Sequence, residues 1–277
     1  MRAVASIFPV YDIAKSVSGG RVGVTMLVPP GAETHDFEPT PGQAISVQKA
    51  DFFLFAGPTL EPWANSFLKA TAGKKTMVVD ASAGANVIYG DSGAGSGAPS
   101  SADPHIWLDF DNASKMADNI AEGFAIGDAD HSDSYKKNAS TLKGLFSALD
   151  AKYKSALGVC KKRTLVHGGH YSLGYIAARY GLRYESAVQS MKDAEPSPAR
   201  VAALVGIIRK VGIKFVFYDE PANKSLAEAI ATESGARTLK INAMHNVTKE
   251  EFEHGVSFVQ LLEINLERLR EGLECPR

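Results

Sequence analysis

Short apolar runs alternate with helical segments along nearly the whole chain, and this alternation constrains the fold more than any other feature. The strand-like runs lie at residues 4–8, 22–28, 52–55, 76–79, 164–166, 184 onward, 215–218 and 238–241. Helical segments lie between or after them at 10–17, 43–50, 172–180, 198–211, 225–234 and 252–274. Because strands that alternate with helices usually form a mostly parallel sheet, the pattern predicts an α/β protein.

One long helix separates this alternation into two series. Apolar residues recur at helical spacing through 132–157, among them Leu142, Phe146, Leu149 and Tyr153. At about 1.5 Å per residue, such a helix is roughly 35–40 Å long. We therefore predict two α/β lobes joined by one long rigid helix. The predicted ranges are an N-terminal lobe at 1–130, a connecting helix at 131–157 and a C-terminal lobe at 158–277.

The composition excludes several classes of protein. The 277 residues are 45% hydrophobic and 22% charged, which is enough apolar material for a sizeable core and argues against disorder. A formal net charge of -1 provides no basic excess for nucleic acid, so we expect no nucleic-acid partner. No apolar run approaches the length of a membrane span. No signal-peptide pattern follows Met1, so export would require that a signal had been removed.

Two further features limit the possible chemistry. Cys160 and Cys275 form no CxxC pair and cannot build a zinc site of four thiolates, which leaves two buried thiols or one disulfide. Residues 90–102 are rich in Gly, Ser and Ala and predict a flexible surface loop. Their glycines do not follow the dinucleotide-binding spacing, and Pro99 opposes the helix that should follow them.

Histidines follow several of the predicted strands. The seven histidines are His35, His105, His131, His167, His170, His245 and His254. In α/β folds, ligands bind at loops beyond the carboxyl ends of strands, where His35, His105 and the 167/170 pair are expected. Neutral imidazole is a common zinc ligand, so these loops predict a metal site; the alternative is solvated surface histidines. We expect His131 at a helix start and His254 on an exposed helix face, whereas His245 stays undecided.

Four ordered segments carry a resemblance to a known family. They are 28–41, which contains His35, then 51–63, then 103–109, which contains His105, and 170–182, which begins with His170. These segments resemble the motifs of cluster A-I solute-binding proteins, the zinc- and manganese-binding components of bacterial ABC importers. Glu220-Pro-Ala-Asn-Lys and the helix with Asn265-Leu266 are also similar, so the resemblance covers nearly the whole chain.

The resemblance implies a metal buried between two lobes. His35, His105 and His170 match the first three ligand positions, with His35 and His105 on one lobe and His170 on the other. His167 falls outside the match and is expected beside the ligands or on the surface. The family's fourth ligand is often an aspartate after the last strand, but residues 240–246 contain no acid. The fourth position therefore stays open among Glu220, His245, Asn242, Glu33 and water.

The acids next to the matched histidines have two open interpretations. Glu33, Asp36, Asp103 and Asp109 either orient ligand imidazoles or serve as loop and cap residues. Because imidazole must lose its proton to bind metal, we expect binding to weaken below about pH 6. For the cysteines, a periplasmic location is compatible with a disulfide that closes the second lobe.

The ligand types favour Zn²⁺ over Mn²⁺, because manganese prefers more oxygen ligands. The resemblance thus implies a monomeric, non-enzymatic receptor, periplasmic or otherwise extracytoplasmic, that delivers zinc to an ABC permease of the inner membrane. Three alternatives stay open. One is a manganese or iron receptor of the same family, and another is a cell-adhesion or purely structural protein. The third is a three-histidine zinc hydrolase, although the chain has no HExxH motif.

Overall fold

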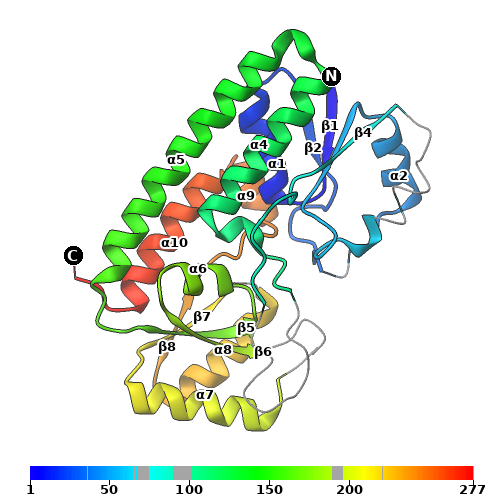
Figure 1. The fold of residues 1–277 in the computed structure, drawn as a ribbon. Helices are drawn as coiled ribbons and strands as arrows, with labels where there is room; N and C mark the ends of the chain where they lie inside the picture. The colour runs from blue at the N-terminus through cyan, green and yellow to red at the C-terminus, as the bar shows by residue number, and fades with distance from the viewer. Residues whose placement is uncertain are drawn as a thin grey trace. The chain divides into compact units, whose positions relative to one another are not determined.

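The structure, a computed structural model, describes residues 1–35, 37–64, 67, 75–89, 102–188, 196–219 and 221–276. Its contacts divide the chain into two compact units, each with its own four-stranded parallel sheet (Figure 1). Unit 1 comprises Met1–Asn86, Asp109–Ala148 and Met244–Gln260. Unit 2 comprises Val87–Leu108, Leu149–Ala243 and Leu261–Arg277. The prediction of two α/β lobes with parallel sheets is confirmed.

The sheet of unit 1 has the order β2-β1-β3-β4. Its strands are β1 (Arg2–Ala5), β2 (Gly23–Met26), β3 (Phe52–Phe55) and β4 (Met77–Asp80). Successive side chains of a strand point to opposite faces, so Phe52 packs on Phe124 and Phe53 packs on Trp63. The first face is covered by α1 (Phe8–Ser18) and α4 (Phe110–Gly127), and α2 (Pro41–Gln48) lies on the other.

The sheet of unit 2 has the order β6-β5-β7-β8. Its strands are β5 (Thr164–His170), β6 (Arg183–Val188), β7 (Phe215–Tyr218) and β8 (Arg237–Lys240). On one face, Val166 and Val216 pack with Leu204 and Ile230 of the helices α7 (Pro198–Val211) and α8 (Pro221–Ser234). On the other face, Phe217 lies against α10 (Phe258–Gly272), near α6 (Gly174–Arg179).

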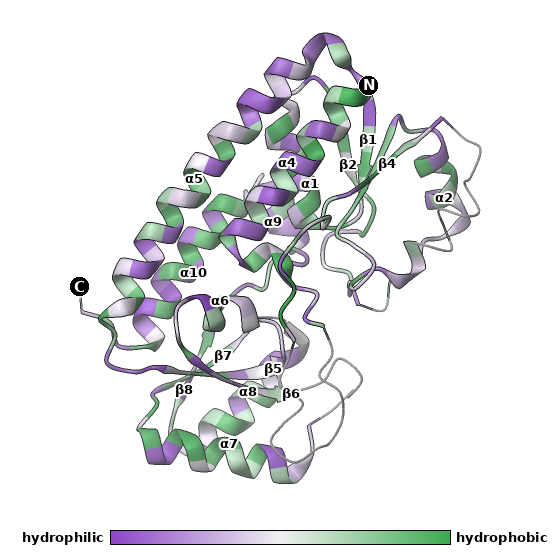
Figure 2. Cartoon of the chain, viewed as in Figure 1, coloured by the Kyte–Doolittle hydropathy of each residue, from purple (hydrophilic) through white to green (hydrophobic). Residues whose placement is uncertain are grey.

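The long helix predicted at mid-chain is α5 (Ser132–Gly158). Hydrophobic and hydrophilic residues alternate along it (Figure 2), and Leu142, Phe146, Leu149 and Tyr153 are buried as their spacing predicts. Its residues up to Ala148 belong to unit 1 and those that follow belong to unit 2. Within the described ranges, no helix combines the length and apolar character needed to cross a bilayer.

The observed organisation differs from the predicted ranges in two places. The expected helix at 252–274 is two helices, α9 (Lys249–Glu253) and α10, and Gly255 lies between them in the left-handed region with φ 69°. Residues 87–89 and 102–108, which carry His105 and the short helix η1 (Ile106–Leu108), belong to unit 2, whereas the predicted ranges place them in the N-terminal lobe. Residues 90–101 of the predicted flexible loop lie outside the described part of the chain.

A disulfide joins Cys160, just after α5, to Cys275, just after α10. Both cysteines belong to unit 2, and 115 positions separate them in sequence. The backbone beside the disulfide is also paired, because the N–H of Lys162 donates to the carbonyl of Leu273. Of the two states that the sequence left open for these cysteines, the structure therefore shows the disulfide.

Candidate metal centre

His105 is held at a defined orientation within unit 2. Its backbone N–H donates to Asp103 Oδ1 at 2.9 Å, and its ring Nδ1 lies 2.7 Å from the same oxygen. Both side chains are buried, and burial raises the pKa of Asp103 to about 8. A cation bound nearby would favour the ionised form of Asp103, and that form accepts the Nδ1–H of His105 and leaves the lone pair of His105 on Nε2, where a metal would bind. The Trp107 indole and the His105 ring pack in a T-shaped arrangement, with 5.4 Å between centroids.

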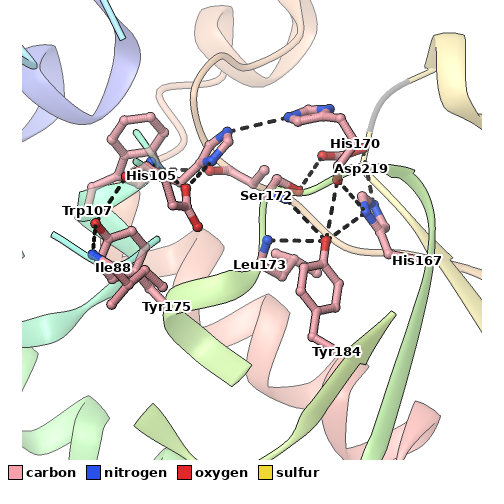
Figure 3. A network of polar contacts seen from close by, with 12 residues as sticks. Ile88, His105, Trp107, His167, His170, Ser172, Leu173, Tyr175, Tyr184 and Asp219 are labelled. Atoms are coloured by element: carbon pink, nitrogen blue, oxygen red, sulfur yellow. Dashed lines mark hydrogen bonds and ion pairs between the residues drawn. The ribbon is translucent and has the colours of Figure 1, made fainter. Parts of the chain in front are cut away.

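His170 lies beside His105 and completes a pair of imidazoles in unit 2 (Figure 3). The two Nε2 atoms are 3.4 Å apart, and the ring centroids are 5.4 Å apart. His170 ends β5, whereas His105 precedes η1, so the pair joins segments 65 residues apart in sequence. The Nε2 atoms therefore point into a common space in which both lone pairs could reach one ion.

A buried polar network lies beneath His170. His167 is fully buried, its Nδ1 lies 3.0 Å from the carbonyl oxygen of His170, and its Nε2 lies 3.3 Å from Asp219 Oδ1. The hydroxyl of Tyr184 lies 3.1 Å from His167 Nδ1 and accepts the backbone N–H groups of Ser172 and Leu173. The register of β5 and β6 shifts between His167 and His170, so this network fixes an irregular strand end (Figure 3). Of the two positions expected for His167, the structure shows the one beside His170.

A second pair of imidazoles, His35 and His245, lies in unit 1. Their ring centroids are 5.3 Å apart, and the planes are inclined by 51°. Their two segments are joined by the side-chain amide of Asn246, which donates to the carbonyls of Pro29 and Ala32 at 2.9 and 2.7 Å. His245 follows Met244, which is buried and adopts φ 62°. This left-handed turn, costly for a residue with a Cβ, sets the direction from which His245 enters the pair.

The other candidates for the fourth ligand have different surroundings. Glu33 Oε1 accepts the backbone N–H groups of Thr34 and His35, so its carboxylate shapes the loop. The backbone of Asn242 is held on both sides by the side chain of Asn265, at 2.9 and 2.7 Å. Glu220 lies outside the described residues, as does Asp36.

The remaining candidates have local roles. Asp109 caps α4, since its carboxylate accepts the N–H groups of Asp111 and Asn112. His131 pairs with Asp128 at the start of α5, and His254 is exposed with its Nδ1 near the carbonyl of Glu250. The positions of both histidines agree with the prediction.

The sequence left His245 as one possibility among five. The feature that kept it among the candidates was its place in the loop after β8, where the carboxyl end of a parallel strand leads to ligand sites. No local pattern distinguished it from Asn242, because both lie in the same loop. Only the packing of 244–260 with unit 1 brings His245 to His35.

Sequence comparison places the chain among known proteins. The family described as zinc-uptake complex component A, periplasmic (ZnuA), matches residues 3–272. The chain belongs to this family. The resemblance of the four sequence motifs is thereby confirmed, because the ZnuA match runs through all of them.

Individual relatives agree with the family. The zinc-binding protein AdcA of Streptococcus pyogenes is 30% identical over 286 residues, which cover 98% of this chain and 55% of that protein. The chain thus spans about half the length of this relative. The high-affinity zinc uptake system protein ZnuA of Bacillus subtilis is 29% identical, covering 99% of this chain and 88% of that protein. The laminin-binding protein Lmb of Streptococcus agalactiae, described as an adhesin with metal-transporting activity, superposes with a TM-score of 0.87 at 28% identity, covering 99% of each chain.

Proposed function

We propose that this chain is the extracytoplasmic receptor of a zinc importer, and that it captures one Zn²⁺ ion and delivers it to an ABC permease. The four proposed ligands are His35 and His245 of unit 1 with His105 and His170 of unit 2. These histidines are a group whose ring nitrogens could hold a metal ion. His245 takes the fourth position in this proposal.

The observation that carries the proposal is the spacing of the unit 2 pair. Zinc binds imidazole nitrogen at about 2.0–2.1 Å with tetrahedral geometry, so two of its ligands lie roughly 3.3–3.4 Å apart. The Nε2 atoms of His105 and His170 are 3.4 Å apart. The unit 2 pair therefore has the separation that two corners of a zinc tetrahedron require.

The ligand set favours zinc over manganese. All four proposed donors are imidazole nitrogens, which suit zinc, whereas manganese is better served by carboxylate and other oxygen ligands. Zinc is also named in the descriptions of the AdcA and ZnuA relatives. A manganese or iron receptor of the same family is the alternative that a metal titration would reveal.

Four protein ligands also argue for a receptor and against a hydrolase. A catalytic zinc keeps one coordination position open for water, whereas a tetrahedral zinc with four imidazoles has none. The family is one of zinc-uptake components described as periplasmic, in accord with an extracytoplasmic location and an ABC permease as partner. We propose that the receptor acts as a monomer.

A metal titration of the chelator-stripped protein tests the proposal. We expect one tight site for Zn²⁺ and a much weaker one for Mn²⁺, measured by competition with a chromophoric chelator. His105→Ala and His245→Ala should each weaken zinc binding strongly, whereas exposed His254→Ala should leave it unchanged. Unchanged zinc binding in both ligand variants would refute the four-histidine site. Tight Mn²⁺ binding with weak Zn²⁺ binding would overturn the choice of metal.

Adhesion is a second candidate function. The observation that favours it is the close structural similarity to the laminin-binding Lmb, which is described as bifunctional. Binding of this chain to immobilised laminin, with and without a chelator, tests it. Saturable binding at micromolar concentration or below would support adhesion, and no binding in either condition would exclude it.

A further inference from the structure

We propose that Tyr175 is a positioning residue that sets the geometry of the His105–His170 pair. This inference rests on the proposed function, because it assumes that both imidazoles ligate the metal. No dashed line in Figure 3 joins Tyr175 to either Nε2 atom, and the proposed effect passes through Asp103 and through the turn that carries His170. The contacts that link Tyr175 to the two imidazoles all lie inside unit 2.

The hydroxyl of Tyr175 connects the backbones of Ile88 and Asp103, two residues that precede His105. It donates to the carbonyl of Asp103 at 3.1 Å and accepts the backbone N–H of Ile88 at 3.3 Å. Ile88 and Asp103 also pair directly, since the N–H of Asp103 donates to the carbonyl of Ile88 at 2.9 Å. Tyr175 is buried, so its hydroxyl fixes the backbone of Asp103 in a place that solvent does not reach.

The position of Asp103 in turn determines the direction of His105. One carboxylate oxygen of Asp103 contacts both the backbone N–H and the ring Nδ1 of His105, at 2.9 and 2.7 Å. A shift of the Asp103 backbone would therefore rotate the imidazole and move its Nε2 away from the position 3.4 Å from His170 Nε2.

Tyr175 is coupled to His170 through a short turn. It lies in the first turn of α6, five positions after His170, and the intervening N–H groups of Ser172 and Leu173 are held by the Tyr184 hydroxyl. The turn also passes very close to Asp103, because a Cβ on Gly174 would lie 2.6 Å from Asp103 Oδ2. One residue thus links the segments of both ligands.

The test compares two tyrosine-to-phenylalanine variants of the full chain. Tyr175→Phe removes the hydroxyl from the metal-site network. Tyr153→Phe is the matched control, because the Tyr153 hydroxyl is also buried in unit 2 and donates to a backbone carbonyl, that of Leu262 at 2.6 Å. The readouts are zinc affinity by chelator competition, the visible absorption spectrum of bound Co²⁺, and the melting temperature of the metal-free protein.

We expect Tyr175→Phe to weaken zinc binding about 10–100-fold, as is typical when a residue that orients a metal ligand is changed. Its Co²⁺ spectrum should differ from that of the unchanged protein, whereas Tyr153→Phe should preserve both affinity and spectrum. Gly174→Ala, which pushes against the Tyr171 ring and Asp103 while it keeps the hydroxyl of Tyr175, should also alter the spectrum. Unchanged zinc affinity and an unchanged Co²⁺ spectrum in Tyr175→Phe would overturn the inference. A lower melting temperature of this variant would then show only a structural role of the hydroxyl.

A ligand variant separates this inference from the proposed function. If His105→Ala weakens zinc binding and Tyr175→Phe does not, the site stands and the role of Tyr175 is wrong. If His105→Ala leaves zinc binding unchanged, the proposed site fails, and the role of Tyr175 fails with it.

Discussion

At the scale of single residues, the same side chain serves different purposes according to its surroundings. His105 is buried with its Nδ1 against a carboxylate, and His170 faces it through Nε2. His167, three positions before His170, instead contacts Asp219 through Nε2 and the backbone carbonyl of His170 through Nδ1. His254 is exposed on a helix end. Burial and hydrogen-bond partners therefore distinguish candidate ligands from structural and surface histidines better than spacing does.

Replacing His245 with glutamate should change the metal preference. His245→Glu exchanges an imidazole for a carboxylate, a ligand type that manganese favours. We expect the ratio of Zn²⁺ to Mn²⁺ affinity to fall by about tenfold, which corresponds to roughly 1.4 kcal/mol. Titrations of both metals measure the ratio, with His254→Glu as the control. An unchanged ratio would show that His245 is not a ligand.

Glu61 should make the stability of the metal-free protein depend on pH. Burial raises its pKa from 4.5 to about 8, against hydrogen bonds from Ser6 and from the backbone of Ala56. The folded state thus binds this proton more tightly than the unfolded state, so stability falls as pH rises from about 4.5 to about 8. Because each unit of pKa is worth about 1.4 kcal/mol, the loss across this range is on the order of 5 kcal/mol.

The variant Glu61→Gln removes the titratable carboxyl group and keeps an oxygen that can accept the N–H of Ala56. Measured by urea denaturation, the free energy of unfolding of this variant should therefore rise relative to that of the unchanged protein between pH 5 and pH 8. Exposed Glu122→Gln, also in unit 1, should show no such trend. Parallel stability curves for Glu61→Gln and the unchanged protein would contradict the prediction.

At the scale of helices and strands, basic side chains stabilise helix ends in unit 2. Lys162 donates to the carbonyl of Val211 at the end of α7. Arg163 donates to the carbonyls of Leu157 in α5 and Tyr180 after α6. Cations at these ends satisfy unpaired carbonyls and oppose the negative pole of the helix dipole. Lys162 and Arg163 therefore stabilise the ends of α5, α6 and α7.

Close packing of β5 on α8 requires a glycine at position 168. A Cβ there would lie 2.5 Å from the Cβ of Ala227, well inside van der Waals contact. Gly168→Ala should destabilise the protein by about 1–3 kcal/mol, because a tightly packed interface must shift. Gly206→Ala in α7, where a Cβ meets nothing within 4 Å, should instead add about 0.5–1 kcal/mol. Denaturation midpoints of the two variants measure the difference, and equal effects would contradict the packing argument.

The disulfide should contribute strongly to the stability of unit 2. It connects the ends of α5 and α10 across 115 positions of chain, and a cross-link of that length restricts the unfolded state greatly. We expect Cys160→Ser with Cys275→Ser to lower the free energy of unfolding by about 2–5 kcal/mol. Denaturation with and without a reductant measures this. The reductant should destabilise the unchanged protein and leave the double variant unaffected; equal stability without reductant would contradict the expectation.

At the scale of the whole molecule, the proposed zinc site draws two ligands from each unit. Zinc that binds only the folded protein should stabilise it by about 4 kcal/mol at a thousandfold excess over the dissociation constant. Thermal unfolding with and without zinc measures the effect at pH 7.5. It should be much smaller at pH 5, because protons compete with zinc for imidazole nitrogen, and it should largely disappear in His170→Ala at pH 7.5. Equal stabilisation at both pH values would contradict ligation by histidine.

The sequence by itself determined the α/β class and the position of most elements. β3 and β7 lie at the predicted residues, and α7 matches the prediction at both ends. These are strongly patterned segments in which an apolar run or a helical period is bounded by Pro, Gly or Ser, so local chemistry suffices. The motifs around His35, His105 and His170 also sufficed to indicate the family.

Tertiary structure alone decided which distant residues meet. It placed His105 with His170 in unit 2 and His245 with His35 in unit 1, and it paired the two cysteines. It also grouped residues 87–89 and 102–108 with unit 2. The reason is physical: local patterns depend on neighbours within a few residues. Contacts across tens or hundreds of residues depend instead on sheet order and core packing, which no single segment encodes.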